Sequence, residues 1–421
     1  MGRTGRDKRP YVKPVKKIEL SNDNVKRRII FVALFLVFGV FCIVQGVSHL
    51  MTVPAGWTEI KVEGASVKNS GSDFTFYYNL GQGDMSASDE KRALTNMYGV
   101  LCVDAYQMFD NYEEAEDKKN IYYINRHPNE EIEIDSVLYS AFEKNAKAKN
   151  RSIFLAPVYE YYNNIFFCEN DSETVDYDPY QNEVIAAFYQ EVTAFSNDET
   201  AVNVELLGEN RIRLFVSDEY LKYAKENDIS SFVDFGWMKN AYIADYIADS
   251  FVENGFGNGM ISSYDGFSRV FIPDDERGSF NLNALYEDRI YPAASVNYSG
   301  SHSIVTLRSY EVIEKDKYNY YTFSNGDVRT PYIDTADGKC KSATPQLTMY
   351  SKSKSCTDVL LEMTRIYVAD VLDETMLEEV KTKDIYSIFF KDNVIYNNGK
   401  DIQLTDLYDK DGIKFTASFV E

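Results

Sequence analysis

The sequence predicts an α+β domain in which helices pack on a mixed sheet, preceded by one N-terminal transmembrane helix. Stretches with the periods of strands and of helices are interspersed through residues 73–421, and residues 29–47 form an apolar run. The 421-residue chain is 44% hydrophobic, which is typical of a protein that buries a large core and not of a disordered chain. This length is compatible with one or two domains.

Residues 231–266 contain the stretch around which the rest of the prediction is organised. Apolar residues recur three or four positions apart from Ala241 to Phe251, and Gly255 stands where a left-handed residue ends a helix. The predicted unit contains, in chain order, a strand at Phe232–Val233, a turn at Asp234–Gly236, the helix, and a strand at Gly259–Ser263. Such turns commonly place backbone N–H groups against a phosphate, although the period alone favours a packed crossover unit without a ligand.

The remaining elements follow from the same two periods and from helix-capping patterns. Helices are expected to begin near Ser86, Asp135, Ser217 and Ser355, and Ser86 and Ser355 each open an S-x-x-D capping box. Further strands are expected at residues 74–78, 211–216, 269–272, 303–310, 318–323, 328–334, 346–351, 386–390 and 394–396. The acidic, turn-rich segment 165–200 is expected to be exposed.

The charge of the chain changes sign after its first 28 residues. Residues 1–28 hold ten basic and three acidic side chains, whereas the whole chain has a net charge of −22. The body that follows this basic segment is therefore strongly acidic. An acidic body argues against a nucleic acid as its main partner.

The apolar run Ile29–Val47 is long enough to cross a bilayer as a helix, because it contains 19 residues without a charge. Lys26, Arg27 and Arg28 precede it, so the positive-inside rule places the N-terminus in the cytoplasm. A cleaved signal peptide is the alternative, but the long basic leader and the lack of a small-x-small pattern after the run disfavour it. We expect a single-pass cell-membrane protein with a cytoplasmic tail (1–28), a transmembrane helix (29–47), a stalk (48–72) with a strand at 58–62, and an extracytoplasmic domain (73–421).

Cysteine and histidine usage does not predict a metal site. The chain has three histidines, and none of its cysteines forms a C-x-x-C pair. Four cysteines follow the apolar run: Cys102, Cys168, Cys340 and Cys356. Cys340 and Cys356 are the disulfide pair to test first, whereas buried free thiols are the simpler expectation for a body of this size.

Several short motifs occur in a fixed order along the body. They are Asp234-Phe235-Gly236-Trp237-Met238-Lys239-Asn240-Ala241 with Asp245, Tyr264-Asp265-Gly266, Tyr298-Ser299-Gly300, the turn from Pro331 through Asp334 to Gly338, and the helix start from Thr357 to Glu362. Their order and spacing over roughly residues 73 to 400 resemble the FAD:protein FMN transferases, the ApbE family. The matching family motifs are D-x-G-G-I-A-K-G-x-x-x-D, a glycine pair, an S-G turn, H-x-x-D-P-x-T-G and A-D-A-x-A-T.

The resemblance implies a fold, an activity and a set of site residues. The activity is transfer of FMN from FAD to a Ser or Thr hydroxyl of an acceptor protein, with Mg²⁺ neutralising the pyrophosphate while a base deprotonates the hydroxyl. The implied flavin-nucleotide residues are Asp234, Gly236, Asp245, Gly266, Ser299, Asp334 and Gly338. The implied Mg²⁺ ligands are Asp358 and Glu362.

This sequence also departs from the family pattern at positions that carry chemistry. The motif lysine is Asn240, its neighbouring glycine is Ala241, and one glycine of the pair is Asp265. The histidine proposed as the base falls on Pro331, which cannot transfer a proton, and the final threonine is Glu362. No catalytic residue is therefore assigned. Two functions remain open, a membrane-anchored FMN transferase and a non-catalytic nucleotide-binding or protein-interaction module on the same fold.

Several candidate residues also have a structural explanation. Asp358 and Glu362 lie four residues apart on one helical face, as two Mg²⁺ ligands would, but Asp358 also completes the capping box of Ser355. Asp234 and Asp334 either line the nucleotide site or cap turns beside glycines. The flavin hypothesis requires a dinucleotide-sized cleft between the Asp234 turn and the Asp358 helix, and it fails if Trp237 and Lys239 fill that cleft.

Overall fold

The computed structural model describes residues 30–31, 33–40, 53–62 and 68–419. The chain divides into two compact units, Met1–Val53 and Pro54–Glu421. In the first unit residues 30–31 and 33–40 are helical, and nowhere in the described chain is a helix both long and apolar enough to cross a membrane. The rest of the expected span 29–47 lies outside the described residues, so the membrane anchor stays a prediction.

The second unit is built on a nine-stranded mixed sheet, which confirms the predicted fold class. Its strands lie in the order β1-β2-β6-β7-β10-β13-β14-β15-β19. Their bounds are Gly56–Ile60, Phe74–Leu80, Gly259–Ser263, Phe267–Phe271, His302–Arg308, Gln346–Ser351, Tyr386–Lys391, Val394–Asn397 and Thr416–Phe419. All neighbours are antiparallel except β15 and β19. Since β1 is an edge strand of this sheet, the compact unit starts at Pro54 and includes part of the segment that the sequence suggests as a stalk.

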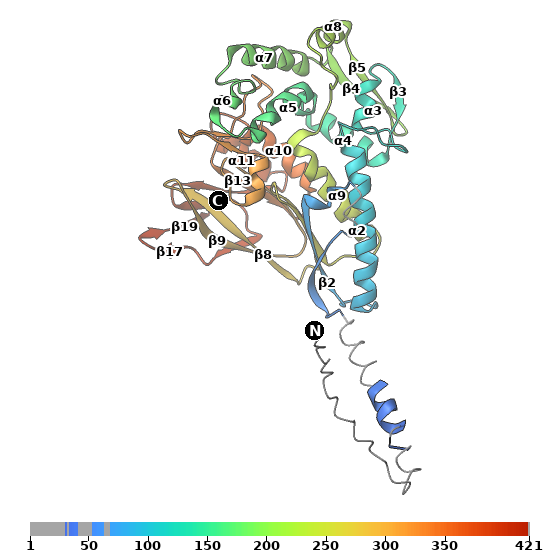
Figure 1. Ribbon diagram of the computed structural model, residues 1–421. Helices are drawn as coiled ribbons and strands as arrows, with labels where there is room; N and C mark the ends of the chain where they lie inside the picture. The colour runs from blue at the N-terminus through green and yellow to red at the C-terminus, as the bar shows by residue number, and fades with distance from the viewer. Residues whose placement is uncertain (1–29, 32, 41–52, 63–67, 420–421) are drawn as a thin grey trace, which may run out of the picture. The chain divides into compact units, whose positions relative to one another are not determined.

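Helices α2 (Ala87–Phe109), α9 (Lys239–Glu253) and α10 (Cys356–Tyr367) lie side by side against strands of the sheet (Figure 1). The residues of β2 alternate between buried and more exposed positions, so every second side chain points to the core. Phe76 of β2 stacks on Phe251 of α9 with ring centroids 4.5 Å apart, and Tyr98 of α2 packs against both rings. Helix α11 (Glu374–Lys381) contacts α10 and β14.

A second sheet packs against the large sheet through its own apolar face. It consists of β8 (Arg277–Tyr286), β9 (Arg289–Ser299) and β16 (Ile402–Thr405), in the order β16-β9-β8. Leu282, Ala294 and Val296 of this sheet form one buried cluster with Ile304 and Ile388 of the large sheet. Sequence analysis missed the β8–β9 hairpin because its two-residue turn, Glu287-Asp288, takes positive φ without the Asn-Gly signal of such turns.

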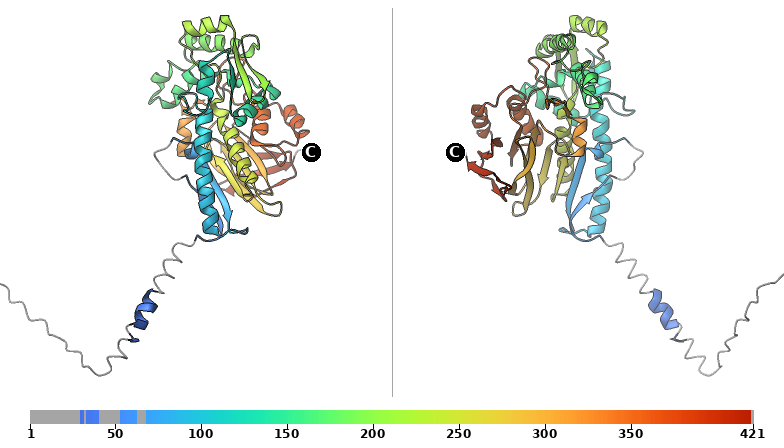
Figure 2. Two further views of the ribbon diagram at one scale, coloured as in Figure 1. Left: turned by 90° about the vertical axis from the view of Figure 1, so that its right-hand side faces the viewer. Right: turned by 60° about the vertical axis from the view of Figure 1, so that its left-hand side comes forward.

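A helical region with a small sheet gathers at one end of the domain, away from β8 and β9 (Figures 1 and 2). The elements are α3 (Ile121–Arg126), α4 (Ser136–Ala148), α5 (Ala156–Tyr162), α6 (Asp171–Thr174), α7 (Glu183–Asn197), α8 (Asp218–Glu226), β3 (Glu131–Glu133), β4 (Val202–Gly208) and β5 (Arg211–Val216). The expectation that 165–200 is exposed holds for many of its residues, but it missed the helices α6 and α7 and the buried face of α7. Tyr189 and Val192 of α7 are fully buried with Leu155 and Tyr162, because its apolar residues share one helical face.

The crossover unit expected around α9 is also wrong in one element. Phe232 and Val233 are not a strand, since their backbone groups bond to the side chain of Asn125 at 2.8 to 3.0 Å. Strand β6 then pairs antiparallel with β2 and β7, so no parallel crossover exists here. Helix α9, the left-handed Gly255 (φ +86°) and β6 itself match the prediction.

Shorter elements complete the chain. They are the 3₁₀ turns η1 (Ser70–Ser72), η2 (Ser152–Phe154), η3 (Asn163–Phe167), η4 (Gly236–Met238) and η5 (Glu314–Tyr318), and the strands β11 (Tyr321–Thr322), β12 (Val328–Arg329), β17 (Asp409–Lys410) and β18 (Ile413–Lys414). The strands expected at 318–323 and 328–334 are thus reduced to the two-residue strands β11 and β12. The four cysteines of the described chain are free thiols, so Cys340 and Cys356 are not bonded to each other.

Candidate functional site

The N-terminus of α10 is closed by the residues that the sequence predicts. Ser355 Oγ accepts a hydrogen bond from the Asp358 N–H (3.2 Å), and Asp358 Oδ2 accepts one from the Ser355 N–H (3.2 Å). The capping box is therefore confirmed. One oxygen of Asp358, an expected metal ligand, is used by the backbone at the start of its own helix.

Asp245 of α9 supplies a carboxylate to the same helix terminus. Its two oxygens accept hydrogen bonds from the N–H groups of Cys356 and Thr357, each at 2.8 Å. Arg269 Nε lies 3.0 Å from Asp245 Oδ1. Because the first N–H groups of a helix attract anions, this buried carboxylate fills the position that a phosphate would take at the N-terminus of α10.

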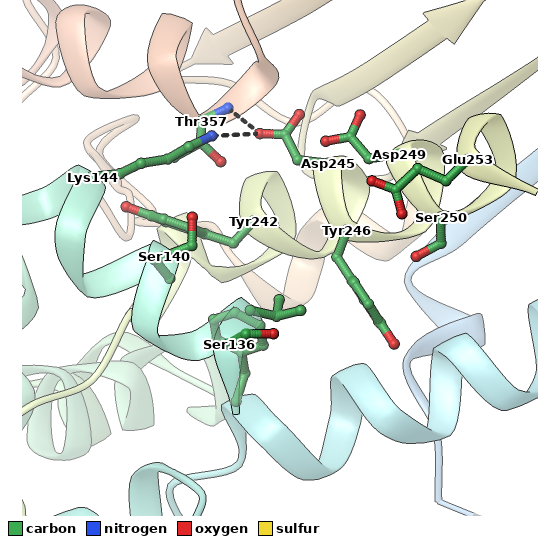
Figure 3. Close-up of a pocket in the computed structure, with 13 residues that line it drawn as sticks. Ser136, Ser140, Lys144, Tyr242, Asp245, Tyr246, Asp249, Ser250, Glu253 and Thr357 are labelled. Carbon is green, nitrogen blue, oxygen red and sulfur yellow. Dashed lines mark hydrogen bonds and ion pairs between the residues drawn. The ribbon is translucent and has the colours of Figure 1, made fainter. Parts of the chain in front are cut away.

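Lys144 of α4 completes this polar junction. Its ammonium donates a hydrogen bond to Ser355 Oγ (2.8 Å) and lies 3.8 Å from Asp245 Oδ2 and 3.9 Å from Asp358 Oδ1. Figure 3 shows Lys144 and Thr357 pointing toward Asp245 from the two neighbouring helices. A cavity of about 370 Å³ opens beside them, and its polar lining also includes Ser136, Ser140, Tyr242, Tyr246, Asp249, Ser250 and Glu253.

Glu362 points into a second cavity that also borders Asp358. Its carboxylate is held by the protein's own cations, with Lys383 Nζ at 2.7 Å and the Arg365 guanidinium at 2.8 Å. Within residues 53–62 and 68–419, no three His, Cys, Asp or Glu side chains are grouped so that they could hold a metal ion. Asp358 and Glu362 share a helical face, as predicted, and no third side chain of these kinds stands with them among the described residues, so their assignment as metal ligands stays a prediction.

The Asp234 turn has the structural role that the sequence leaves open. Asp234 is buried, and its Oδ1 accepts a hydrogen bond from the Gly236 N–H (3.0 Å), while Asn111 Nδ2 lies 3.4 Å from Oδ2. Burial raises the pKa of the Asp234 carboxyl above its ordinary value. Gly236 takes φ +51°, and a Cβ there would lie 2.7 Å from the ring of Tyr159. Both residues are therefore explained by the turn itself.

Two of the departures from the motif pattern contact each other. Asn240 Nδ2 donates a hydrogen bond to Asp265 Oδ2 (2.9 Å); Asn240 is buried and Asp265 is half-buried. Burial raises the pKa of Asp265 to about 6. Gly266, the next residue, has φ +105°, and a Cβ there would lie 2.1 Å from the Thr306 carbonyl oxygen. Gly266 is thus required by the close approach of β10 to the β6–β7 turn.

The remaining predicted residues lie in one turn and at the end of a strand. Asp334 forms an ion pair with Lys341 (2.8 Å), and its backbone carbonyl accepts a hydrogen bond from the Gly338 N–H. Gly338 takes φ +71° and packs against Tyr189. Ser299 is the last residue of β9, in the second sheet.

Aromatic rings connect the Asp234 turn to the C-terminal end of α10. Trp237 of η4 packs edge-on against Tyr332 at 5.0 Å, and Tyr332 packs edge-on against Tyr367 of α10 at 5.3 Å. The hydroxyls of Tyr320 and Tyr332 are 3.1 Å apart. Trp237 therefore packs toward the C-terminal end of α10, whereas Asp358 lies in the first turn of that helix and Lys239 begins α9.

Comparison with known proteins identifies the architecture. No family model matches the chain, and no curated protein matches it significantly. The ApbE protein from Thermotoga maritima superimposes with a TM-score of 0.53 at 12% identity, covering 83% of this chain and 97% of that protein. The flavin transferase ApbE from Vibrio cholerae gives a TM-score of 0.51 at 13% identity, covering 84% of this chain and 98% of that one.

The chain has the ApbE fold. The α+β architecture that the motif order implies is therefore confirmed over most of the domain. Identities this low establish the shared fold and leave the chemistry to be judged from the side chains.

The side chains of this ApbE-like domain do not fit Mg²⁺ or a nucleotide at the expected positions. Five carboxylates are expected there, and each is engaged by a group of the chain itself: Asp234 by Gly236, Asp245 by the amides of α10, Asp334 by Lys341, Asp358 by Ser355, and Glu362 by Lys383 and Arg365. A hard cation needs carboxylate oxygens that are free to coordinate it. Asp358 Oδ1 is the least engaged oxygen of this set, since its ion-pair partner Lys144 Nζ lies 3.9 Å away, and the other four carboxylates would exchange closer contacts for a metal ion.

Sequence reasoning missed the cations that neutralise this site in the ApbE-like fold. Lys144 and Lys383 belong to α4 and to the segment after α11, and nothing in their local sequence indicates Asp245, Asp358 or Glu362, although Lys383 also pairs with Glu379 four residues earlier (3.6 Å). Lys341 is different, because it lies four residues after Asp337 and pairs with it at 3.1 Å. The i, i+4 spacing of Asp337 and Lys341 is a sequence signal from which this ion pair could be predicted.

Proposed function

We propose that this chain is a non-catalytic binding module with the ApbE fold. One observation carries the proposal: every carboxylate at a position implied for Mg²⁺ or nucleotide binding is engaged by donors or cations of the protein itself. Removing such partners from partly or fully buried charges is costly, so these contacts compete directly with a metal or a phosphate.

The base position supports the same proposal. Pro331 stands where the family has its histidine, and its side chain cannot accept a proton. His302 does not take over this role. It is buried at the start of β10, its Nδ1 is 3.1 Å from the Gly300 carbonyl oxygen, and its ring packs against Tyr298 in the second sheet. Burial lowers the pKa of His302, which weakens it as a base.

Retained FMN transfer is the alternative function. It is favoured by coverage, because the alignment spans 97% and 98% of the two ApbE proteins, so the domain contains nearly the whole fold. The protein acceptor that such an activity needs would carry a reactive Ser or Thr.

We further propose that residues 29–47 anchor this module to the cell membrane, with residues 1–28 in the cytoplasm and the ApbE-like domain outside. The proposal rests on the uncharged 19-residue run and on Lys26, Arg27 and Arg28 before it. Proteinase added to intact cells should digest the domain and spare an epitope tag at the N-terminus. Protection of the domain would contradict this orientation.

The transfer test uses the purified full-length protein with FAD, Mg²⁺ and a flavin-acceptor protein. We expect no covalently bound flavin fluorescence on the acceptor after denaturing electrophoresis. The flavin transferase ApbE from Vibrio cholerae, in the same mixture, is the matched positive control. Labelled acceptor in the reaction with this chain would overturn the non-catalytic proposal.

A further inference from the structure

A cavity of about 900 Å³ lies beside the N-terminal half of α10. It is unusual for so acidic a chain because four lysines line it: Lys144 and Lys147 of α4, Lys354 before α10, and Lys383 after α11. Its apolar wall contains Leu206, Leu361 and Ile385. This volume and this mixture of charged and apolar walls are typical of small-ligand sites.

Two of the four lysines are neutralised inside the cavity. Lys383 pairs with Glu362 (2.7 Å), and Lys144 bonds to Ser355 near Asp358. The ammonium groups of Lys147 and Lys354 have no hydrogen bond or ion pair among the described residues. Their charge is therefore available to a ligand.

Lys354 is fixed at its backbone. Its N–H donates to Ser351 Oγ (3.1 Å), and its carbonyl accepts from Ser303 Oγ (2.6 Å). The start of α10 cannot bind an anion in its place, because Asp245 already accepts its first N–H groups. An anion in this cavity would therefore be bound by the lysines.

Three acidic residues line the cavity, and Glu143 opposes anion binding most directly because the other two, Asp358 and Glu362, lie near Lys144 and Lys383. Glu143 lies one helical turn before Lys147 on α4 and forms no ion pair with any described residue. Its charge lowers the affinity for an anion, so its removal should have the opposite effect from the removal of a lysine.

We propose that this cavity binds an organic phosphate through Lys147 and Lys354 without a divalent metal ion. The inference rests on the proposed function in one respect, since it takes Asp358 and Glu362 as partners of cationic side chains and not as metal ligands. The two ammonium groups, one on α4 and one just before α10, together balance the charge of a dianion. The apolar wall accommodates an organic substituent.

The test uses the full-length protein, with inorganic pyrophosphate and phenyl phosphate as probes in isothermal titration calorimetry at low ionic strength. Binding of both is expected in EDTA, with no gain on addition of Mg²⁺. Phenyl phosphate is expected to bind more tightly than inorganic phosphate because its ring contacts the apolar wall. Absence of binding, or binding that requires Mg²⁺, would overturn the inference.

Charge variants separate the cavity from general surface attraction. K147Q/K354Q should weaken pyrophosphate binding at least about tenfold, because each lysine donates a charge-assisted hydrogen bond. K222Q/K225Q removes the same charge from two lysines of α8 that do not line the cavity, and it should change the affinity less than about twofold, since they act on a ligand there only through screened charge. E143Q should strengthen binding. Equal losses in the two double variants would refute the site.

The result is independent of the transfer test. If the protein transfers flavin and does not bind phosphate in the absence of metal, both proposals are refuted. If it transfers flavin and also binds phosphate in the absence of metal, only the non-catalytic function is refuted. If neither occurs, the cavity inference fails and the non-catalytic proposal stands.

Discussion

At its N-terminal end α10 is held by charged and polar groups, whereas at its C-terminal end it is held by aromatic rings. Asp245, Lys144 and the capping box surround the first turn, next to two open cavities. Tyr367 at the other end is fully buried against Tyr332. The comparison teaches that one helix of an ApbE-like fold is held by two different kinds of contact, by charged and polar groups at one end and by aromatic packing at the other.

Asp245→Ala should produce the largest loss of stability, because it removes the carboxylate at the charged N-terminal end of α10. The substitution leaves two helix N–H groups and the half-hidden Arg269 without their carboxylate, at a cost of about 3–5 kcal/mol in the free energy of unfolding. Denaturant titration of the full-length protein measures it. Asp249→Ala is the control, since that exposed residue pairs with the same arginine and should cost less than about 1 kcal/mol. Equal losses of unfolding free energy in the two variants would mean that the hydrogen bonds from Asp245 to the N-terminus of α10 add nothing beyond the contact with Arg269.

Tyr367→Ala tests the aromatic end. Loss of a fully buried ring should reduce the free energy of unfolding by about 3 kcal/mol, through lost contacts and the cavity left behind. Tyr161→Ala removes the same ring from an exposed position on α5, and it should change stability by less than about 0.5 kcal/mol. A restored affinity for FAD in Tyr367→Ala would sharpen the comparison, because it would show that the rings alone exclude the flavin.

Asp265→Asn tests the Asn240–Asp265 pair through its pH dependence. The folded pKa of about 6 lies above the ordinary value of 3.8, so this carboxyl contributes stability below about pH 4 that is lost as the pH rises through 6. The variant should therefore gain roughly 1–2 kcal/mol over the wild type at pH 7.5 and no advantage at pH 4. Thermal unfolding between pH 4 and 8 measures the difference, and a constant offset across this range would contradict the assignment.

Glu362→Gln should have the smallest effect. Its partners Lys383 and Arg365 are partly exposed, so the loss should be at most about 1 kcal/mol in the free energy of unfolding. Addition of Mg²⁺ should not raise the melting temperature of the wild type or of the variant, since the carboxylate is already paired. Stabilisation of the wild type alone by Mg²⁺ would restore Glu362 as a metal ligand.

Local rules were sufficient for the elements next to the site. The helix from 239 to 253, its left-handed Gly255, the capping box of Ser355 and the turn from 334 to 338 depend on contacts within five residues. The same rules failed for Phe232 and Val233, whose apolar side chains fit a strand. Their backbone groups are instead bonded by Asn125, more than a hundred residues earlier, which no local pattern records.

The sequence by itself determined the α+β class, the cores of α9 and α10, and the loss of the motif histidine at Pro331. Only the tertiary structure decided what Asp245 and Glu362 do, because Lys144, Lys383 and the amides of α10 reach them from distant parts of the chain. A carboxylate has the same sequence signature whether it holds a metal, caps a helix or pairs with a lysine. The partner that folding brings within hydrogen-bonding distance sets its role.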